Sequence, residues 1–155
     1  METGVTDEFD LRILRCLARD GRLTVQGLSE AVGLSPSPVA RRLARLEDHG
    51  FIRGYAALID EVRLGFGVSV FVSVKLDRQV DDALAKFEDA IGRMPEVVDC
   101  WLMTGNRDYL LRVVTRDMGE FEQFLTTKLT RLAPVAGIES SIPLRRVKAG
   151  IARTP

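Results

Sequence analysis

The chain has 155 residues, 46% of them apolar, with 22 basic and 22 acidic side chains and a formal net charge of zero. This length suits one or two small domains, and so large an apolar fraction excludes a disordered chain. The balanced charge excludes a polyanion-binding surface over the whole molecule but allows a local basic face. No apolar run reaches the roughly 18 residues of a membrane-spanning helix, and the acidic start METGVTDEFD is unlike a signal peptide. We therefore expect a cytoplasmic protein.

Cysteine and histidine are too scarce for a metal centre. Cys16 and Cys100 lie far apart in the sequence without a CxxC motif, and His49 is the only histidine. The pattern favours two buried, reduced thiols and predicts neither a disulfide nor a zinc site. No cofactor and no catalytic constellation are expected.

The first 50 residues have apolar side chains at helical spacing. Asp7, Thr24 and Ser35 are candidate N-caps, and Gly33 and Gly50 are candidate left-handed C-terminal residues. These start and stop signals predict three short helices, at about 7–19, 25–32 and 36–49. The tight turn between the second and third helices makes a helix-turn-helix pattern.

The third predicted helix belongs to the stretch GLSPSPVARRLARLEDHGFI (33–52), which is rich in arginine. Val39, Leu43 and Leu46 form its apolar stripe, so the polar side chains project elsewhere. An arginine-rich face is often plain solvated surface. Here, however, the turn residues, the helix lengths and the placement of the arginines all favour a DNA-recognition helix. Such side chains can reach bases and phosphates in a major groove of double-stranded DNA. The predicted DNA-binding residues are Ser35, Ser37, Pro38, Arg41, Arg42 and Arg45.

The second half of the sequence alternates between strand and helix patterns. Strands are predicted at about 66–76, 97–104, 108–115 and 137–147, and helices at about 80–91 and 118–132. This βαββαβ order predicts a ferredoxin-like domain in which two helices cover one face of a four-stranded sheet. Phe71, Trp101 and Met103 fall on the other face, which predicts a partner subunit there and at least a dimer.

The fold class is thus expected to be α+β, with three sections. A three-helix, winged helix-turn-helix domain is expected over residues 1–52. A hinge strand and linker follow over residues 53–65, with the strand at IRGYAAL (52–58). The ferredoxin-like domain is expected over residues 66–155.

Three stretches give the chain a resemblance to a known family. EFDLRILRCLARDGRLTVQGLSEAVGLS (8–35) is similar to the first two helices of the leucine-responsive and asparagine-responsive (Lrp/AsnC, feast/famine) transcriptional regulators. GLSPSPVARRLARLEDHGFIRGY (33–55) resembles their recognition helix and following strand. TGNRDYLLRV (104–113) resembles their second signature, usually a Gly-Asp-x-Asp-Tyr turn between two strands.

The resemblance implies a DNA-binding domain, a hinge strand, and an amino-acid-sensing domain that dimerises through its sheet and assembles into tetramers, octamers or larger forms. It also implies that the effector binds between dimers, close to the signature turn. Gly105 would let the backbone approach the α-carboxylate, and Asp108 would accept from the α-ammonium. Thr104 and Tyr109 would supply hydroxyls or a wall. Asn106 stands where the family usually has an acidic residue, and it keeps a hydrogen-bonding group without the charge.

The predicted function is therefore that of a sequence-specific DNA-binding transcriptional regulator, whose assembly or DNA binding is modulated by a small effector, an amino acid. One alternative is an effector-independent DNA organiser, in which the turn at 104–109 is an ordinary hairpin. Another is an enzyme, since haem-pathway decarboxylases acting on a tetrapyrrole share this two-domain arrangement. That chemistry would use clustered histidines or arginines, and no histidine follows His49. A bare amino-acid-binding module would leave the third helix without a purpose.

Overall fold

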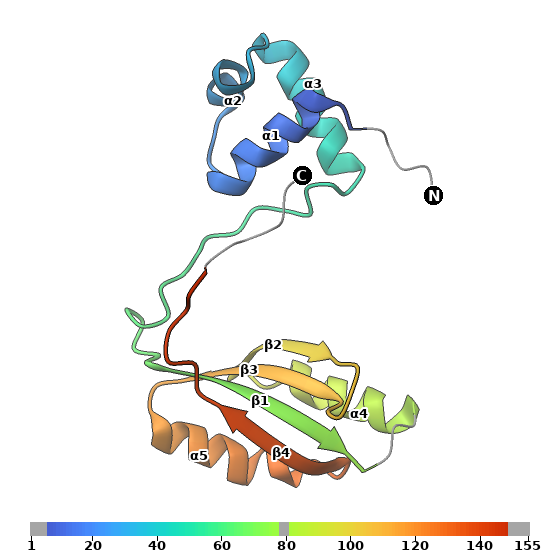
Figure 1. The fold of residues 1–155 in the computed structure, drawn as a ribbon, viewed down its shortest axis with the longest axis vertical. Helices are drawn as coiled ribbons and strands as arrows, with labels where there is room; N and C mark the ends of the chain where they lie inside the picture. The colour runs from blue at the N-terminus through green and yellow to red at the C-terminus, as the bar shows by residue number, and fades with distance from the viewer. Residues whose placement is uncertain (1–5, 78–80, 149–155) are drawn as a thin grey trace. The chain divides into compact units, whose positions relative to one another are not determined.

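Three helices form the first part of the chain, as the sequence predicts. The computed structural model describes residues 6–77 and 81–148. The chain divides into two compact units, with boundaries between Leu58 and Ile59 and between Arg146 and Val147. The first unit contains α1 (Glu8–Arg19), α2 (Val25–Val32) and α3 (Pro36–Asp48), shown in blue to cyan in Figure 1. No described helix is both long and apolar enough to cross a membrane.

Two of the three predicted N-caps, Asp7 and Thr24, make side-chain cap hydrogen bonds. The carboxylate of Asp7 accepts from the Asp10 amide at 3.0 Å, and the Asp10 carboxylate accepts from the Asp7 amide at 3.2 Å. This reciprocal capping box satisfies two amides that the first turn of a helix leaves unpaired. Thr24 caps α2 through the Gly27 amide at 3.1 Å. Ser35 holds the N-cap backbone conformation of α3 but makes no side-chain cap hydrogen bond.

Two glycines end α2 and α3 in the left-handed conformation. Gly33 and Gly50 have φ angles of 73° and 74°, which residues with a Cβ rarely adopt. After α3, the Gly50 amide donates to the Glu47 carbonyl at 3.0 Å and the Ile52 amide to the Leu46 carbonyl at 3.1 Å. This Schellman-like ending turns Ile52 back onto the helices. The buried core of this unit consists of Ile13, Leu28, Val32, Val39 and Leu46.

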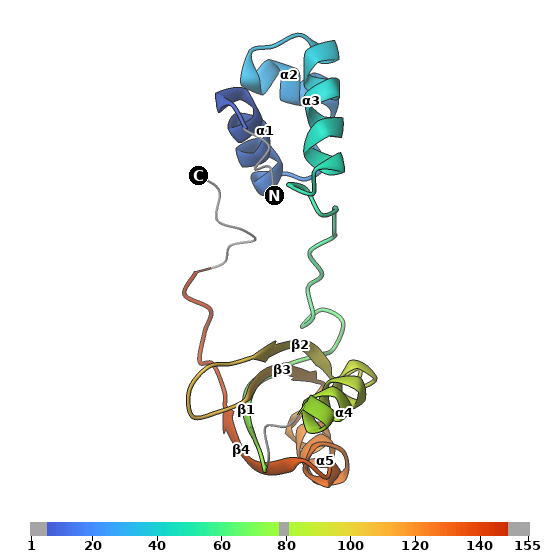
Figure 2. The same ribbon diagram turned by 90° about the vertical axis from the view of Figure 1, so that its right-hand side faces the viewer.

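The second unit is a ferredoxin-like βαββαβ fold, which confirms the α+β prediction. Its main elements are β1 (Val68–Leu76), α4 (Asp81–Gly92), β2 (Val97–Leu102), β3 (Tyr109–Thr115), α5 (Met118–Thr127) and β4 (Val135–Ser141). The sheet is antiparallel in the order β2-β3-β1-β4. Both helices lie on the same face of the sheet, as Figure 2 shows.

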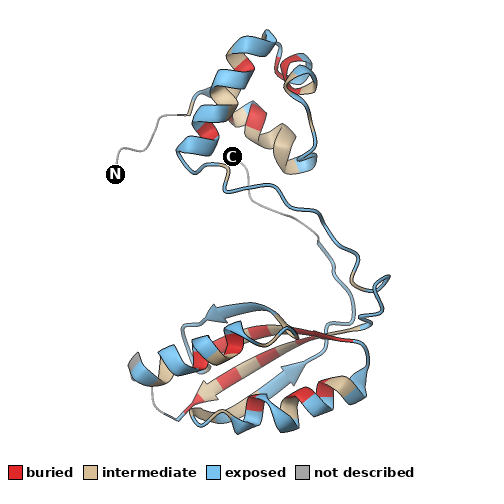
Figure 3. Ribbon diagram, turned by 180° about the vertical axis from the view of Figure 1, so that it is seen from behind, coloured by how far each residue is buried: buried red, intermediate tan, exposed pale blue. Residues whose placement is uncertain are grey.

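Burial along the central strands follows the predicted alternation. Val70, Val72 and Val74 are buried beneath the helices, and Figure 3 shows the buried positions gathered along β1 and β3. On the opposite face, Trp101 and Met103 are 44% and 43% exposed. This open face of the sheet carries large apolar residues without a helix to cover them.

The ends of several elements differ from the sequence prediction. The helix expected over 118–132 stops at Thr127 and is followed by a short 3-10 turn, Leu129–Arg131. The last strand stops at Ser141 and not near 147, because its pairing with β1 runs out at Phe71. Cys100 is exposed, contrary to the expectation of a buried thiol, because β2 lies at the edge of the sheet.

The hinge strand expected within residues 53–65 is not formed in this single chain. A strand requires a neighbouring strand for its backbone hydrogen bonds, and no described segment of this chain pairs with these residues. The segment exposes large apolar side chains, namely Tyr55, Leu58, Ile59, Val62 and Leu64.

Candidate functional site

The outer surface of α3 holds several of the predicted DNA-binding residues. Ser35, Ser37 and Arg41 are exposed, whereas Pro38 is half-buried. Within the described part of the chain, the guanidinium of Arg41 makes no ion pair. The short hydroxyls and this guanidinium are therefore open to a ligand along the first two turns of the helix.

Arg42 and Arg45 have partners on α1, and the shared partner is the buried Asp10 carboxylate. Arg42 Nη1 donates to Asp10 Oδ1 at 2.9 Å, and Arg45 Nη2 donates to Asp10 Oδ2. The side chain of Arg42 is 24% exposed and that of Arg45 is 50% exposed. The three arginines of α3 thus have different surroundings.

A second carboxylate and an aromatic ring complete the surroundings of Arg42. Its Nη1 also donates to Asp7 Oδ2 at 2.7 Å, and its guanidinium carbon lies 5.6 Å from the centre of the Phe9 ring. Hydrogen bonds to Asp10 and then to Asp7 raise the pKa of Arg42 above its ordinary value. The pKa of Asp7 is lowered, chiefly by the hydrogen bond from the Asp10 amide and also by Arg42.

Sequence reasoning did not predict this cluster. Asp10 lies three positions before Ile13, on the buried face of α1. A carboxylate on an apolar stripe is rarely buried without a cationic partner. That position was the available signal for a basic residue on a neighbouring helix.

The turn predicted to bind an effector lies between β2 and β3. Thr104, Gly105 and Asn106 are exposed at its tip. Gly105 has a φ of 107°, which strongly favours glycine. Arg107 donates to Glu139 of β4 at 2.9 Å.

The side chain of Asp108 points into the end of the sheet. It is buried, and its Oδ2 accepts from the Leu76 amide at 2.7 Å. Its Oδ1 lies 3.5 Å from Lys75 Nζ, and its own amide donates to the Val74 carbonyl at 2.8 Å. Asp108 therefore joins the turn to the end of β1.

Tyr109 lies on the helix-covered face, in the core. Its hydroxyl donates to Glu88 Oε1 at 2.7 Å, and its ring centre lies 4.6 Å from that of Phe87. Burial, together with the neighbouring Glu88, raises the pKa of the tyrosine. The structure thus separates the five predicted effector residues into an exposed tip (Thr104, Gly105 and Asn106) and two buried supports (Asp108 and Tyr109).

An ion-pair network that the sequence analysis did not anticipate lies on the open face of the sheet. Arg112 of β3 donates from Nη1 and Nη2 to the two carboxylate oxygens of Glu61, at 3.0 and 2.8 Å. Its Nε donates to Asp99 of β2 at 3.1 Å. Arg112 lowers the pKa of Glu61. This bidentate pair attaches the turn that precedes β1 to the sheet.

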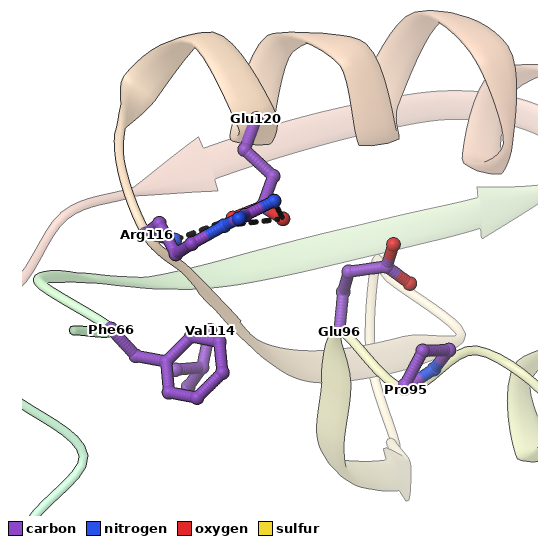
Figure 4. Close-up of a pocket in the computed structure, with 6 residues that line it drawn as sticks. All are labelled: Phe66, Pro95, Glu96, Val114, Arg116 and Glu120. Carbon is purple, nitrogen blue, oxygen red and sulfur yellow. Dashed lines mark hydrogen bonds and ion pairs between the residues drawn. The ribbon is translucent and has the colours of Figure 1, made fainter. Parts of the chain in front are cut away.

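A pocket of about 330 Å³ lies near the opposite end of β3 from the turn, and Figure 4 shows its lining. Its lining residues are Phe66, Pro95, Glu96, Val114, Arg116 and Glu120. Arg116 forms an ion pair with Glu120 at 3.0 Å, and one Glu96 oxygen accepts from Lys128 at 2.5 Å. None of the residues predicted to bind an effector lines this pocket.

Comparison with known proteins identifies both units. The family profile described as winged helix-turn-helix DNA-binding matches residues 6–53, and that of the Lrp/AsnC ligand binding domain matches residues 69–152. The Bkd operon transcriptional regulator of Pseudomonas aeruginosa is 50% identical over 141 residues, covering 91% of this chain and 92% of that protein. The leucine-responsive regulatory protein of Escherichia coli is 37% identical, covering 92% of this chain and 87% of that protein.

Solved structures share the fold over almost the whole chain. A transcriptional regulator from Neisseria meningitidis, solved in complex with L-methionine, matches with a TM-score of 0.90 and 39% identity, covering 94% of each chain. An AsnC family transcriptional regulator from Agrobacterium tumefaciens matches with a TM-score of 0.88 and 33% identity, covering 96% of each chain.

Proposed function

The chain belongs to the Lrp/AsnC family of transcriptional regulators, and we propose that it binds specific double-stranded DNA sites through α3 in response to an amino acid. The observation that carries this proposal is the exposed guanidinium of Arg41, which makes no ion pair among the described residues and lies near the exposed Ser35 and Ser37 at the start of α3. That helix belongs to a unit separate from the ligand-binding domain. The relatives named above are regulators, and we propose no enzymatic activity.

The proposed DNA-contacting residues lie along the start and outer side of α3. Ser35, Ser37, Pro38 and Arg41 would meet bases and phosphates first, with the half-exposed Arg45 reaching phosphates at the next turn. Arg42 is the least exposed of the three arginines of α3. Guanidinium groups suit this surface because they can bind guanine or phosphate with two donors at once.

We also propose that DNA binding requires a homo-oligomer. Residues 1–60 contain eight arginines and nine acidic residues, so a single N-terminal unit has little net attraction for DNA. Two recognition helices in one dimer would bind two half-sites and supply the missing affinity. Trp101 and Met103 on the open face of the sheet support dimerisation there.

The proposed effector site is the turn at residues 104–108. The α-carboxylate of an amino acid would bind the exposed backbone near Gly105, with Thr104 and Asn106 beside it. Asp108 and Tyr109 would hold the turn from below, and the Asp108 carboxylate would attract the α-ammonium. The methionine complex of the Neisseria relative supports an amino acid as the ligand class.

DNA binding is tested by fluorescence anisotropy with a duplex from the region upstream of the protein's own gene and a random duplex of equal length. A salt-sensitive preference for the upstream duplex is expected. Equal affinity for both duplexes at every salt concentration would contradict the proposed sequence-specific function.

The effector is tested by a thermal-shift screen against the twenty amino acids, followed by light scattering on any amino acid that stabilises the protein. A ligand present at about 100 times its dissociation constant adds roughly 2.7 kcal/mol of stability, which such a screen detects. No shift with any amino acid, together with intact DNA binding, would instead favour an effector-independent DNA organiser.

A further inference from the structure

We infer that Asp10 is a positioning residue of the DNA-binding surface: its buried carboxylate holds Arg42 against α1, restrains the half-exposed Arg45, and leaves Arg41 as the arginine of α3 that projects toward DNA without a carboxylate partner among the described residues. This inference rests on the proposed DNA binding by α3. It reassigns Arg42, which the sequence alone places among the DNA contacts, to the architecture of the first unit.

The geometry around Asp10 supports a clamp between two helices. Each carboxylate oxygen accepts from a different arginine of α3, and Oδ2 also accepts from the Asp7 amide at 3.2 Å. The side chain has no exposed surface. A buried carboxylate with this many donors is fixed in place, and it fixes the guanidinium groups that approach it.

Arg42 is enclosed more completely than a phosphate-binding side chain would be. Asp7 and Asp10 both accept from its Nη1, and the Phe9 ring lies on its face. A DNA phosphate would have to compete with two carboxylates that are already within hydrogen-bonding distance. Arg41 is the adjacent residue, yet it has no carboxylate partner in the described chain.

Charge neutrality gives the cluster a second consequence. The two arginines Arg42 and Arg45 are balanced by the two aspartates Asp7 and Asp10. The cluster therefore adds little to non-specific attraction for the phosphate backbone, which depends on uncompensated positive charge. Two of the three arginines of α3 are thus neutralised and contribute little to sequence-independent DNA binding. The preference for one DNA sequence over another then depends on the exposed residues.

The experiment compares three single variants of the full-length protein, Arg41→Gln, Arg42→Gln and Arg42→Lys. Each is measured with the upstream duplex over a series of salt concentrations, and each is also melted without DNA. Arg42→Lys is the discriminating variant. A lysine keeps the positive charge that a phosphate contact needs, but it lacks the planar fork that lies between two carboxylates and an aromatic ring.

We expect Arg41→Gln to weaken binding about tenfold and to reduce the salt dependence, with an unchanged melting temperature. We expect both Arg42 variants to lower the melting temperature while the slope of log affinity against log salt stays at the wild-type value. An Arg42→Lys variant with wild-type melting, together with an Arg42→Gln variant whose salt slope falls as far as that of Arg41→Gln, would overturn the inference.

Asp10→Asn tests the clamp from the acidic side. If this variant is folded, it should bind the random duplex severalfold more tightly and with a steeper salt dependence, because two arginines lose a charged partner. If Asp10→Asn folds and its affinity for the random duplex is unchanged, the inference is contradicted. If Asp10→Asn does not fold, the melting temperature of Arg42→Lys is the deciding measurement. If the wild-type protein shows no preference for the upstream duplex, the proposed function fails, whereas the clamp is still judged by that melt.

Discussion

Each of the two units buries one aspartate, and the two carboxylates differ in which partner lies closest. Asp10 in the helical unit binds two guanidinium groups from another helix. Asp108 in the sheet unit accepts at 2.7 Å from the Leu76 amide at the end of a neighbouring strand, and its other oxygen lies farther, 3.5 Å, from the Lys75 ammonium. These are the only acidic side chains buried among the described residues.

The difference follows from how helices and strands form their hydrogen bonds. A helix satisfies its backbone groups internally, so only side chains can join one helix to another. The strands of a sheet are joined through their backbones, and an aspartate at a turn can extend that pairing by accepting one more amide. A small three-helix unit has few contacts between helices, which makes a charged clamp such as Asp10 correspondingly important.

The largest predicted effect is that of Asp10→Ala. Removing the carboxylate leaves Arg42 partly buried beside Asp7 alone, which should lower the free energy of unfolding of the first unit by about 3 kcal/mol. Hydrogen exchange of the α1 and α3 amides measures this loss. Glu30→Ala, which removes only the exposed bond to Gln26, is the matched control. Equal exchange in the two variants would show that Asp10 is not a clamp.

Asp108→Ala should have the second-largest effect, confined to the sheet unit. The buried Leu76 amide loses its acceptor, at a cost of about 2 kcal/mol. Trp101 is the only tryptophan and lies on β2, so its fluorescence reports denaturant unfolding of this unit. Asp89→Ala, which removes an exposed ion pair with Arg93 just after the end of α4, should leave that transition in place. If Asp108→Ala also made the α1 amides exchange faster, the two buried aspartates would not stabilise their units independently.

The two tyrosines of the chain provide a smaller, matched comparison between the units. Tyr109 donates to Glu88 from the core, and Tyr55 donates to Glu47 from an exposed position. We expect Tyr109→Phe to lower the stability of the sheet unit by about 1 kcal/mol. Tyr55→Phe should have almost no effect on the helical unit, because water can replace its hydrogen bond. Similar losses in both units, measured by hydrogen exchange, would argue against this distinction.

The smallest predicted effect is that of Glu61→Gln on the open face of the sheet. Arg112 holds the pKa of Glu61 below its ordinary value of 4.5. The ion pair therefore contributes its full stabilisation at pH values above the ordinary pKa of Glu61. This contribution is lost as the pH falls through the lowered pKa of Glu61 in the folded protein. At neutral pH the variant should lose less than about 1 kcal/mol, and its stability should depend less on acid pH than that of the wild type. Denaturation followed by Trp101 fluorescence at several pH values measures both effects. An acid dependence of stability that is unchanged in Glu61→Gln would contradict the assignment.

Much of the fold follows from local sequence signals. The caps at Asp7 and Thr24, the left-handed Gly33 and the alternation along β1 each depend on neighbouring residues, and all were predicted. The end of β4 depends on where its backbone pairing with β1 ends, at Phe71, so local sequence could not give it. The same reason explains why an isolated hinge segment carries a strand pattern without forming a strand.

The candidate site was predicted less completely than the fold. The helical wheel correctly places Arg41 outward, but the pairing of Arg42 with Asp10 joins residues 32 positions apart. Likewise, the signature turn identifies Asp108 and Tyr109 without indicating that one side chain enters the strand end and the other the core. Sequence motifs indicate which residues belong to the site, whereas long-range packing determines which of their atoms are exposed to a ligand.

The most direct test of the account is the affinity of the full-length protein for its upstream duplex, measured by anisotropy with and without each amino acid that stabilises it. Effector-modulated DNA binding predicts that at least one such amino acid changes the dissociation constant for the upstream duplex. It also predicts that the same amino acid leaves the affinity for a random duplex nearly constant. An upstream-duplex affinity unaffected by every stabilising amino acid, with no change in oligomer size, would contradict it.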